Sequence, residues 1–279
     1  MMKQNKFLAL KNMIWAVGIA VCLAFVIIGL LFAMFHKYTG GEENFNTSLG
    51  AGLSSASEEK TVDLSSDALG SGVSRGELYL LERTDDAGDA YLSTITFLID
   101  STYIGLRDLN LVGTNQVWAT NSGSLKMDSL PSAVIKFPND GSEISPVSAA
   151  MVAKPKILVI AIGMDGLANV DENTFITNYD NMINDIKSAS PDTKVICCGL
   201  PSVIAGYSGG DGLNVGRVSD GNDWVQFVCR DTGSYFLNAQ EELSESVQLL
   251  SRFASANGKT LNRKGLDAFL GYLTTHAIP

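Results

Sequence analysis

The chain has 279 residues and a formal net charge of −10, with 20 basic and 30 acidic residues. Four of the basic residues lie at or before Lys37, where there is no acidic residue, so the rest of the chain carries a net charge of −14. Such an acidic surface argues against nucleic acid and anionic lipid as partners. The four cysteines and two histidines show no metal-site spacing, so the sequence predicts no metal and no other cofactor.

An uncharged apolar segment spans Met13–Phe35. At about 1.5 Å per residue, a helix of this length crosses the roughly 30 Å hydrocarbon core of a bilayer. Lys3, Lys6 and Lys11 precede the segment, and the rule that positive charge stays inside places residues 1–12 in the cytoplasm. Bulky residues at the end of the segment argue against signal-peptide cleavage. The sequence therefore predicts a single-pass protein of the cell membrane, with its anchor at residues 13–35 and its C-terminal part extracytoplasmic.

Residues 36–76 are rich in Gly, Ser, Glu and Asp and poor in large apolar side chains. Such a stretch cannot bury enough surface to offset the entropy that is lost on ordering, so we expect a flexible stalk. The folded domain is expected to occupy residues 77–279.

Apolar runs alternate with helical patterns along this domain. Strands are predicted at residues 94–99, 156–162, 194–200 and 234–238. Helices are predicted at residues 174–188, 222–230, 243–254 and 262–274. Because strands and helices alternate, the expected fold class is α/β, a three-layer α/β/α sandwich with a short parallel sheet.

Three cysteines fall in this domain. Cys197 and Cys198 are adjacent on a predicted strand, so at most one of them faces a given side of the sheet. One of them could pair with Cys229 in an oxidising compartment. The alternative is that all three are buried free thiols.

Polar residues follow the predicted strands at their carboxyl ends, where parallel α/β folds place their sites. Asp100 and Ser101 follow the strand at 94–99, and the sequence GMDG at 163–166 follows the strand at 156–162. The loop 257–261 precedes the last helix. We expect these three segments to meet.

The same segments resemble the blocks of the GDSL/SGNH hydrolases in order and spacing. The matching stretches are TFLIDSTYIGLRD, VWATNSGSL, KILVIAIGMDGL with the helix, turn and strand that follow it, and NGKTLNRKGLDAFLGYLTTH. The resemblance implies a domain that hydrolyses or transfers acyl esters. A serine attacks, a histidine takes its proton, and an aspartate three residues before it orients that histidine. A glycine N–H and an asparagine side chain hold the oxyanion.

Carried over residue by residue, the resemblance gives a degenerate catalytic set. Ser101 stands at the nucleophile position with Asp100 before it, and Gly123 stands at the oxyanion glycine. Asp165 replaces the asparagine, Asn257 the aspartate and Thr260 the histidine. Threonine cannot act as a base near neutral pH, and an ionised aspartate cannot donate to an oxyanion. The standard mechanism is therefore expected to fail.

Several alternatives stay open for these residues. Asp100 and Ser101 could serve only to cap the turn into a helix. Asp165 or the displaced His276 could act as a base for Ser101. Gly163, Trp118 and Tyr207 are candidate ligand-binding residues at the site. The Gly-rich stretch 208–212 is expected to be a surface loop near the mouth of the site.

The leading hypothesis is a bacterial, membrane-anchored pseudo-hydrolase of the cell envelope. It would bind a cell-surface glycan, an acylated sugar or an envelope protein through the former active-site cleft. The first alternative is an active serine esterase or O-acyltransferase on acylated cell-surface carbohydrate with rearranged residues. The second is a structural subunit of an envelope assembly. An open cleft lined by Trp118 or Tyr207 would favour binding, and a filled cleft at Ser101 would favour the structural role.

Overall fold

The computed structural model describes residues 76–279. The predicted cytoplasmic N-terminus, the membrane anchor at 13–35 and almost all of the predicted stalk lie outside the described residues and stay predictions. Among the helices between residues 76 and 279, none has the length and hydropathy needed to span a membrane.

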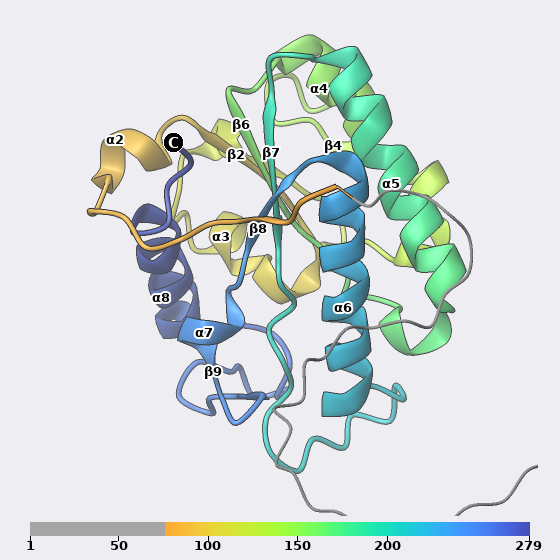
Figure 1. The fold of residues 1–279 in the computed structure, drawn as a ribbon, viewed down its shortest axis with the longest axis vertical. Coiled ribbons are helices and arrows are strands. Elements are labelled where there is room, and N and C mark those ends of the chain that lie inside the picture. The colour runs from red at the N-terminus through yellow and green to blue at the C-terminus, as the bar shows by residue number, and fades with distance from the viewer. Residues whose placement is uncertain (1–75) are drawn as a thin grey trace, which may run out of the picture. The chain divides into compact units, whose positions relative to one another are not determined.

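The described domain is built on a parallel sheet of six strands (Figure 1). The strand order is β1-β8-β7-β6-β2-β3, and every neighbouring pair runs parallel. The strands are β1 (Tyr79–Leu80), β2 (Ile95–Ile99), β3 (Val117–Trp118), β6 (Ile157–Ala161), β7 (Lys194–Cys198) and β8 (Tyr235–Leu237). The four strands predicted from the sequence are confirmed as β2, β6, β7 and β8. The two-residue strands β1 and β3 at the edges carry too short a pattern to be predicted.

Helices cover both faces of this sheet, as the predicted fold class requires (Figure 1). One face carries α4 (Pro146–Ala153), α5 (Glu172–Ala189) and α6 (Val215–Thr232). The other carries α2 (Gly88–Leu92), α3 (Gly105–Asp108), α7 (Gln240–Leu243) and α8 (Arg263–Thr274). Single-turn 3-10 helices are η1 (Ser101–Tyr103), η2 (Thr114–Gln116) and η4 (Leu167–Asn169), and η3 (Met127–Ser132) is longer. A hairpin of β4 (Ile135–Lys136) and β5 (Glu143–Ile144) lies beside the sheet.

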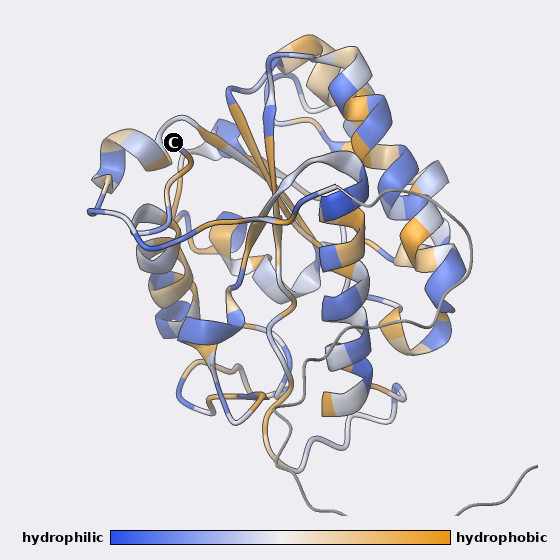
Figure 2. Cartoon of the chain, viewed as in Figure 1, coloured by the Kyte–Doolittle hydropathy of each residue, from blue (hydrophilic) through white to orange (hydrophobic). Residues whose placement is uncertain are grey.

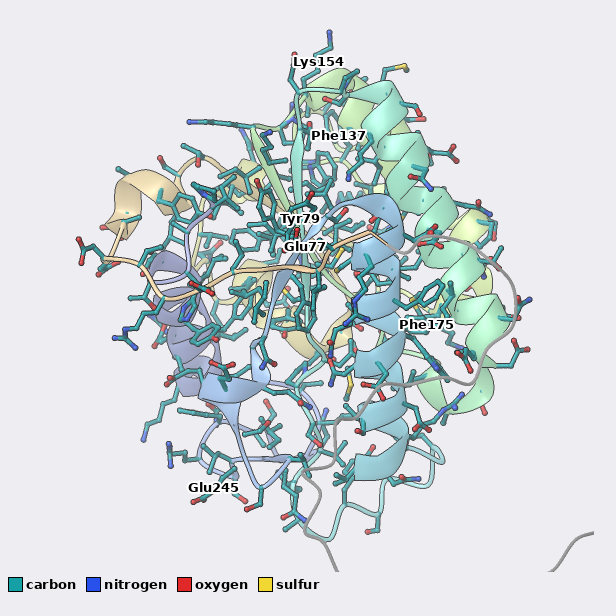
Figure 3. The ribbon with its side chains drawn as sticks, viewed as in Figure 1. Glu77, Tyr79, Phe137, Lys154, Phe175 and Glu245 are labelled. Carbon is teal, nitrogen blue, oxygen red and sulfur yellow. The ribbon has the colours of Figure 1, made fainter. Side chains whose placement is uncertain are left out.

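The core is divided by the sheet into two apolar clusters. Side chains alternate along each strand, so Leu158 and Ile160 of β6 enter the cluster under α5 and α6, whereas Val159 enters the cluster under α8. This explains why β6 reads as an unbroken apolar run: both of its faces are buried. Figure 2 shows the apolar strands at the centre and hydrophilic residues on the outer faces of the helices. Figure 3 shows Phe175 of α5 near α6, where its ring centroid lies 5.3 Å from that of Trp224.

The cysteines follow the same alternation. Cys197 lies in the cluster under α5 and α6, and Cys198 lies in the opposite cluster, as predicted. Cys229 of α6 shares the cluster of Cys197, yet all three are free thiols in the buried core. Burial raises the pKa of the Cys198 thiol well above its ordinary value. These cysteines therefore act as small apolar side chains.

Two helix predictions differ from the structure. Helix α6 begins at Val215, seven residues before the predicted start, with Asn214 accepting the N–H of Arg217 as its cap. Gly216 and Gly221 weaken the helical pattern there, and Gly221 is required because a Cβ would lie 2.8 Å from the Leu200 side chain. The gain in packing outweighs the weak helix propensity of these residues.

The predicted helix at 243–254 is wrong. The chain forms a tight hairpin of β9 (Ser244–Glu245) and β10 (Gln248–Leu249) instead. The two residues of its turn, Ser246 and Val247, both have positive φ, at 48° and 59°. Neither residue type favours that conformation, so the sequence carried no turn signal.

The strained turn residue gives a stability prediction. Replacing Val247 with glycine should raise the free energy of unfolding by about 1 kcal/mol, because glycine adopts positive φ without the steric cost that a β-branched residue bears. Val152 of α4 is a matched control, because its exposed fraction of 62% is close to the 58% of Val247. Val152→Gly should lower the free energy of unfolding by about 0.5 kcal/mol. Urea unfolding of both variants measures the difference, and a loss of stability in Val247→Gly would contradict the strained turn.

Candidate functional site

The carboxyl ends of β2 and β6 meet at one edge of the sheet. Ile99 pairs with Ala161, and the N–H of Asp100 donates to the Ala161 carbonyl over 3.2 Å. Parallel register therefore places Asp100 and Ser101 beside the segment Gly163–Asp165. The expectation that these two segments meet is correct.

Asp100 anchors this junction from inside. Its Oδ2 accepts the N–H groups of Gly163, Met164 and Asp165 at 3.0, 2.9 and 3.3 Å, and its Oδ1 accepts the N–H of Thr102 at 2.9 Å. The residue is fully buried. Asp100 is the cap of η1, as the capping interpretation holds, and it joins that turn to the end of β6.

Ser101 is held by Asp165. The Ser101 hydroxyl donates to Asp165 Oδ1 over 2.6 Å, and its N–H donates to Asp165 Oδ2 over 3.1 Å. Asp165 Oδ2 also accepts the N–H of Leu125 at 3.0 Å. Asp165 is 8% exposed, so these bonds form where water competes weakly. One carboxylate thus takes up the hydroxyl and two backbone donors of the site.

The two carboxyl groups of the site influence each other. Burial raises the pKa of Asp100, and the nearby charge of Asp165 raises it further, while the backbone N–H bonds oppose the shift. The resulting pKa of Asp100 is about 7. Ionisation at this junction is therefore sensitive to pH in the neutral range.

Gly163 allows a backbone conformation that residues with a side chain rarely adopt. Its φ is +130°, and a Cβ would lie 2.8 Å from the Leu200 side chain. That conformation turns its N–H, with the two that follow, toward Asp100. The structure gives Gly163 this positioning role, and its part in ligand binding stays a prediction.

Gly123 is a correction to the expectation drawn from the resemblance. Its N–H donates to the Thr120 carbonyl over 3.1 Å within its own turn, and φ is +79°. The backbone donor that reaches the site from this loop is the N–H of Leu125. Leu125 could not be identified from sequence motifs, because a backbone N–H belongs to every residue type except proline.

The terminal loop lies beside the Ser101 turn. The N–H of Leu261 donates to the Thr102 carbonyl over 3.0 Å, one residue beyond the two candidate positions Thr260 and Ser101. The side chains, however, face each other within the loop. Asn257 Oδ1 accepts the N–H and the hydroxyl of Thr260 at 3.0 and 3.1 Å, so the two residues that were expected to replace the catalytic aspartate and histidine form a turn with each other.

The sequence motifs did not indicate that Lys259 and Asp211 form an ion pair near the site. Lys259 Nζ lies 2.8 Å from Asp211 Oδ2, and the Tyr207 hydroxyl donates to the same oxygen over 2.9 Å. Partial burial lowers the pKa of Lys259, but the bond to Asp211 and the charges of Asp211 and Asp165 outweigh it and hold the pKa above its usual value. This links the loop of residues 208–212 to the terminal loop near Asp165. Tyr207 is half-buried there.

Two further expectations are corrected. Trp118 is 1% exposed and packs edge-on against Phe137 at 6.3 Å between ring centroids, so it offers no ring face to a ligand. His276 lies after the C-terminal end of α8, whose N-terminal end is at the Ser101 turn. The 12 residues of α8 span roughly 18 Å, so His276 is too far from Ser101 to act as its base. Its Nδ1 contacts the Tyr272 carbonyl at 2.8 Å.

Comparison with known proteins gives a likeness of fold. No family model and no curated protein matches the chain. A structure described as a lipolytic protein of the G-D-S-L family from Desulfitobacterium hafniense is 17% identical, with a TM-score of 0.46, over 66% of this chain and 99% of that one. A GDSL-like lipase from Bacteroides thetaiotaomicron is 13% identical, with a TM-score of 0.44, over 65% and 86%. A peptidoglycan O-acetylesterase is 14% identical, with a TM-score of 0.39, over 46% of this chain and 38% of that one. The GDSL-like resemblance is one of fold, and it says nothing of activity.

The raised pKa of Asp100 predicts how stability depends on pH. Between pH 3.8 and about 7 the folded protein binds more protons at Asp100 than the unfolded chain, so the free energy of unfolding should fall as the pH rises through this window. Asp165→Asn removes the neighbouring charge and should make that fall smaller. Urea unfolding at a series of pH values measures it.

A control separates this effect from a second carboxyl. Asp180 also has its pKa raised to about 7, by burial and by the adjacent Asp231, and so acts in the same direction. Asp231→Asn should reduce only the contribution of Asp180, and the double variant should show both reductions. An unchanged pH slope in Asp165→Asn would rule out the proposed coupling between the two carboxyl groups of the site.

Proposed function

We propose that the chain is a membrane-anchored, extracytoplasmic domain of SGNH-hydrolase-like fold that does not hydrolyse esters and that acts by binding a ligand or partner. A single observation carries the proposal: the Asp165 carboxylate accepts the hydroxyl and N–H of Ser101 and the N–H of Leu125. The donors are the candidate nucleophile itself and two N–H groups beside it. In a working site those two N–H groups would be free to bind the oxyanion of a substrate.

The electrostatics of this arrangement oppose acyl transfer. A tetrahedral intermediate carries an oxyanion that needs free donors, and here a fixed anion holds two backbone N–H groups. Loss of one donor costs roughly 10²–10³ in rate, and the carboxylate adds repulsion. Loss of a triad base costs on the order of 10⁴–10⁶. Thr260 stands where the resemblance places the histidine, and its hydroxyl donates to Asn257 within the loop.

The alternative of an active esterase rests on the bond of 2.6 Å between the Ser101 hydroxyl and Asp165. A carboxylate at that distance could take the serine proton. The same carboxylate also holds the Ser101 and Leu125 N–H groups, so it would have to serve as base and release the oxyanion donors in one step. Because Asp165 would have to meet both demands, the active esterase is the less well supported of the two functions.

The proposed location of the domain, outside the cell and anchored to the membrane, is argued from the sequence. The apolar segment 13–35 and the lysines before it support an anchor with the domain outside the cell, and the acidic surface argues against nucleic acid. A cell-surface glycan or an envelope protein is the proposed partner class. Burial of Trp118 removes one of the two aromatic side chains expected to line a cleft, and Tyr207 remains.

The proposal predicts that Ser101 is unreactive. The full chain should neither turn over a chromogenic acetyl ester faster than its Ser101→Ala variant nor become labelled at Ser101 by a fluorophosphonate probe. Spectrophotometric turnover and mass spectrometry of the labelled protein measure the two properties. Ser142→Ala, which removes an exposed serine from the β4–β5 turn, is the control for non-specific labelling.

Turnover or labelling that persists in Ser142→Ala and disappears in Ser101→Ala would overturn the proposal. Asp165→Asn would then show whether Asp165 is the base: the activity should vanish with the carboxylate if it is. Asparagine keeps the size of the side chain and an oxygen that can accept the two N–H groups.

A further inference from the structure

A pocket of about 460 Å³, lined by apolar side chains as well as by hydroxyl and charged groups, lies next to the Asp165 site. It is formed by the loop after β3, the helix η3 and the β4–β5 hairpin. Its wall includes Leu125, whose N–H is bound by Asp165, and Lys126, whose Cβ faces Gly166. The pocket therefore shares one loop with the former catalytic centre.

Part of the pocket lining is apolar and belongs to the buried core. Leu125 and Ile135 line it and are 2% and 0% exposed. Behind them Phe137, which Figure 3 labels, packs edge-on against Trp118. A lining that belongs to the core holds the polar groups beside it in place, and preorganisation reduces the entropy lost on binding.

The hydroxyl groups of the pocket are arranged to accept hydrogen bonds. Thr120 donates its hydroxyl proton to the Ser124 carbonyl at 3.0 Å, and Ser132 donates to the Ser129 carbonyl at 3.1 Å. Ser129 in turn donates to the Lys126 carbonyl at 3.4 Å. Ser122 Oγ lies 3.2 Å from Thr120 Oγ1 and accepts the Ser124 N–H at 3.3 Å, so these two hydroxyl groups also bond within the loop. Ser129 and Ser132 commit their protons to backbone carbonyls, and their oxygens are left to accept from a ligand. A ligand rich in hydroxyl groups supplies such donors.

The charges of the pocket add a preference for an anion. Lys126 and Lys136 line it, both are exposed, and within the described residues neither has an acidic side chain at ion-pair distance. Glu143, the acidic residue of the lining, is hydrogen-bonded by the Asn121 side-chain amide. The pocket thus presents two free ammonium groups on a domain whose overall charge is strongly negative. An ammonium group binds a carboxylate as a point charge with up to three donors.

We infer that this pocket binds an acidic sugar of the uronate type, with Lys126 and Lys136 on its carboxylate and the serine oxygens accepting from its hydroxyl groups. The inference rests on the proposed function, because it names the ligand class of that binding domain. It places the ligand on the loop whose Leu125 N–H donates to Asp165.

The test is calorimetric titration of the full chain with a tetramer of galacturonic acid. The carboxyl-reduced, neutral form of the same tetramer is the ligand control. The acidic tetramer should bind, the neutral one should bind at least about tenfold more weakly, and the affinity should fall with added salt. The double variant Lys126→Gln/Lys136→Gln should lose affinity for the acidic tetramer by about tenfold or more.

Lys154→Gln/Lys264→Gln is the matched control, because it removes the same charge from two exposed lysines outside the pocket. Equal affinity in the two double variants, equal binding of the two tetramers, or no binding of the acidic tetramer would overturn the inference. None of these results bears on whether Ser101 is reactive. Turnover that depends on Ser101 would instead overturn the proposed function, whatever the outcome of the titration.

Discussion

Four backbone N–H groups converge on the buried carboxylate of Asp100, and the arrangement of the site depends on that convergence. The side chain joins the turn after β2 to the turn after β6, two segments more than sixty residues apart in the chain. A buried carboxylate is tolerable only when donors satisfy it, and here the donors are the turns that it positions. Ser101 and Asp165 follow in the two turns that this side chain joins, and they are brought together as a consequence.

Asp165, the second carboxylate of the site, is also satisfied by donors from neighbouring segments. Asp165 satisfies the Ser101 and Leu125 N–H groups and the Ser101 hydroxyl, so these donors are paired within the protein. An asparagine in this position would present an amide donor where aspartate presents an acceptor. The proposed lack of hydrolysis therefore rests on one exchange of a donor for an acceptor at residue 165. Burial, together with the nearby charge of Asp165, raises the pKa of Asp100 toward neutrality.

The replacements at the terminal loop fit this picture. Asn257 and Thr260 make a turn with each other, and Lys259 pairs with Asp211, which also accepts the Tyr207 hydroxyl. These contacts keep the loop against the Ser101 turn through the Leu261 N–H without any catalytic group in it. The junction between the terminal loop and the Ser101 turn is therefore held by hydrogen bonds among its own polar groups. The accepting hydroxyls and free lysines lie in the adjacent pocket, on the other side of the Leu125 loop.

The sequence by itself determined the parallel α/β sheet, because buried strands such as β6 and amphipathic helices such as α5 and α8 have patterns with distinct periods. It also determined that the segments at Asp100, Asp165 and the terminal loop meet, since parallel strands bring their carboxyl ends to one edge. The sequence did not reveal the hairpin after α7, because its turn residues Ser246 and Val247 have positive φ although neither residue type favours it. Nor did it reveal which N–H groups reach Asp165, that Trp118 is buried, or that Lys259 pairs with Asp211. Those are decided by the tertiary structure, because backbone donors carry no residue signature and side-chain partners distant in the chain are chosen only when the loops pack together.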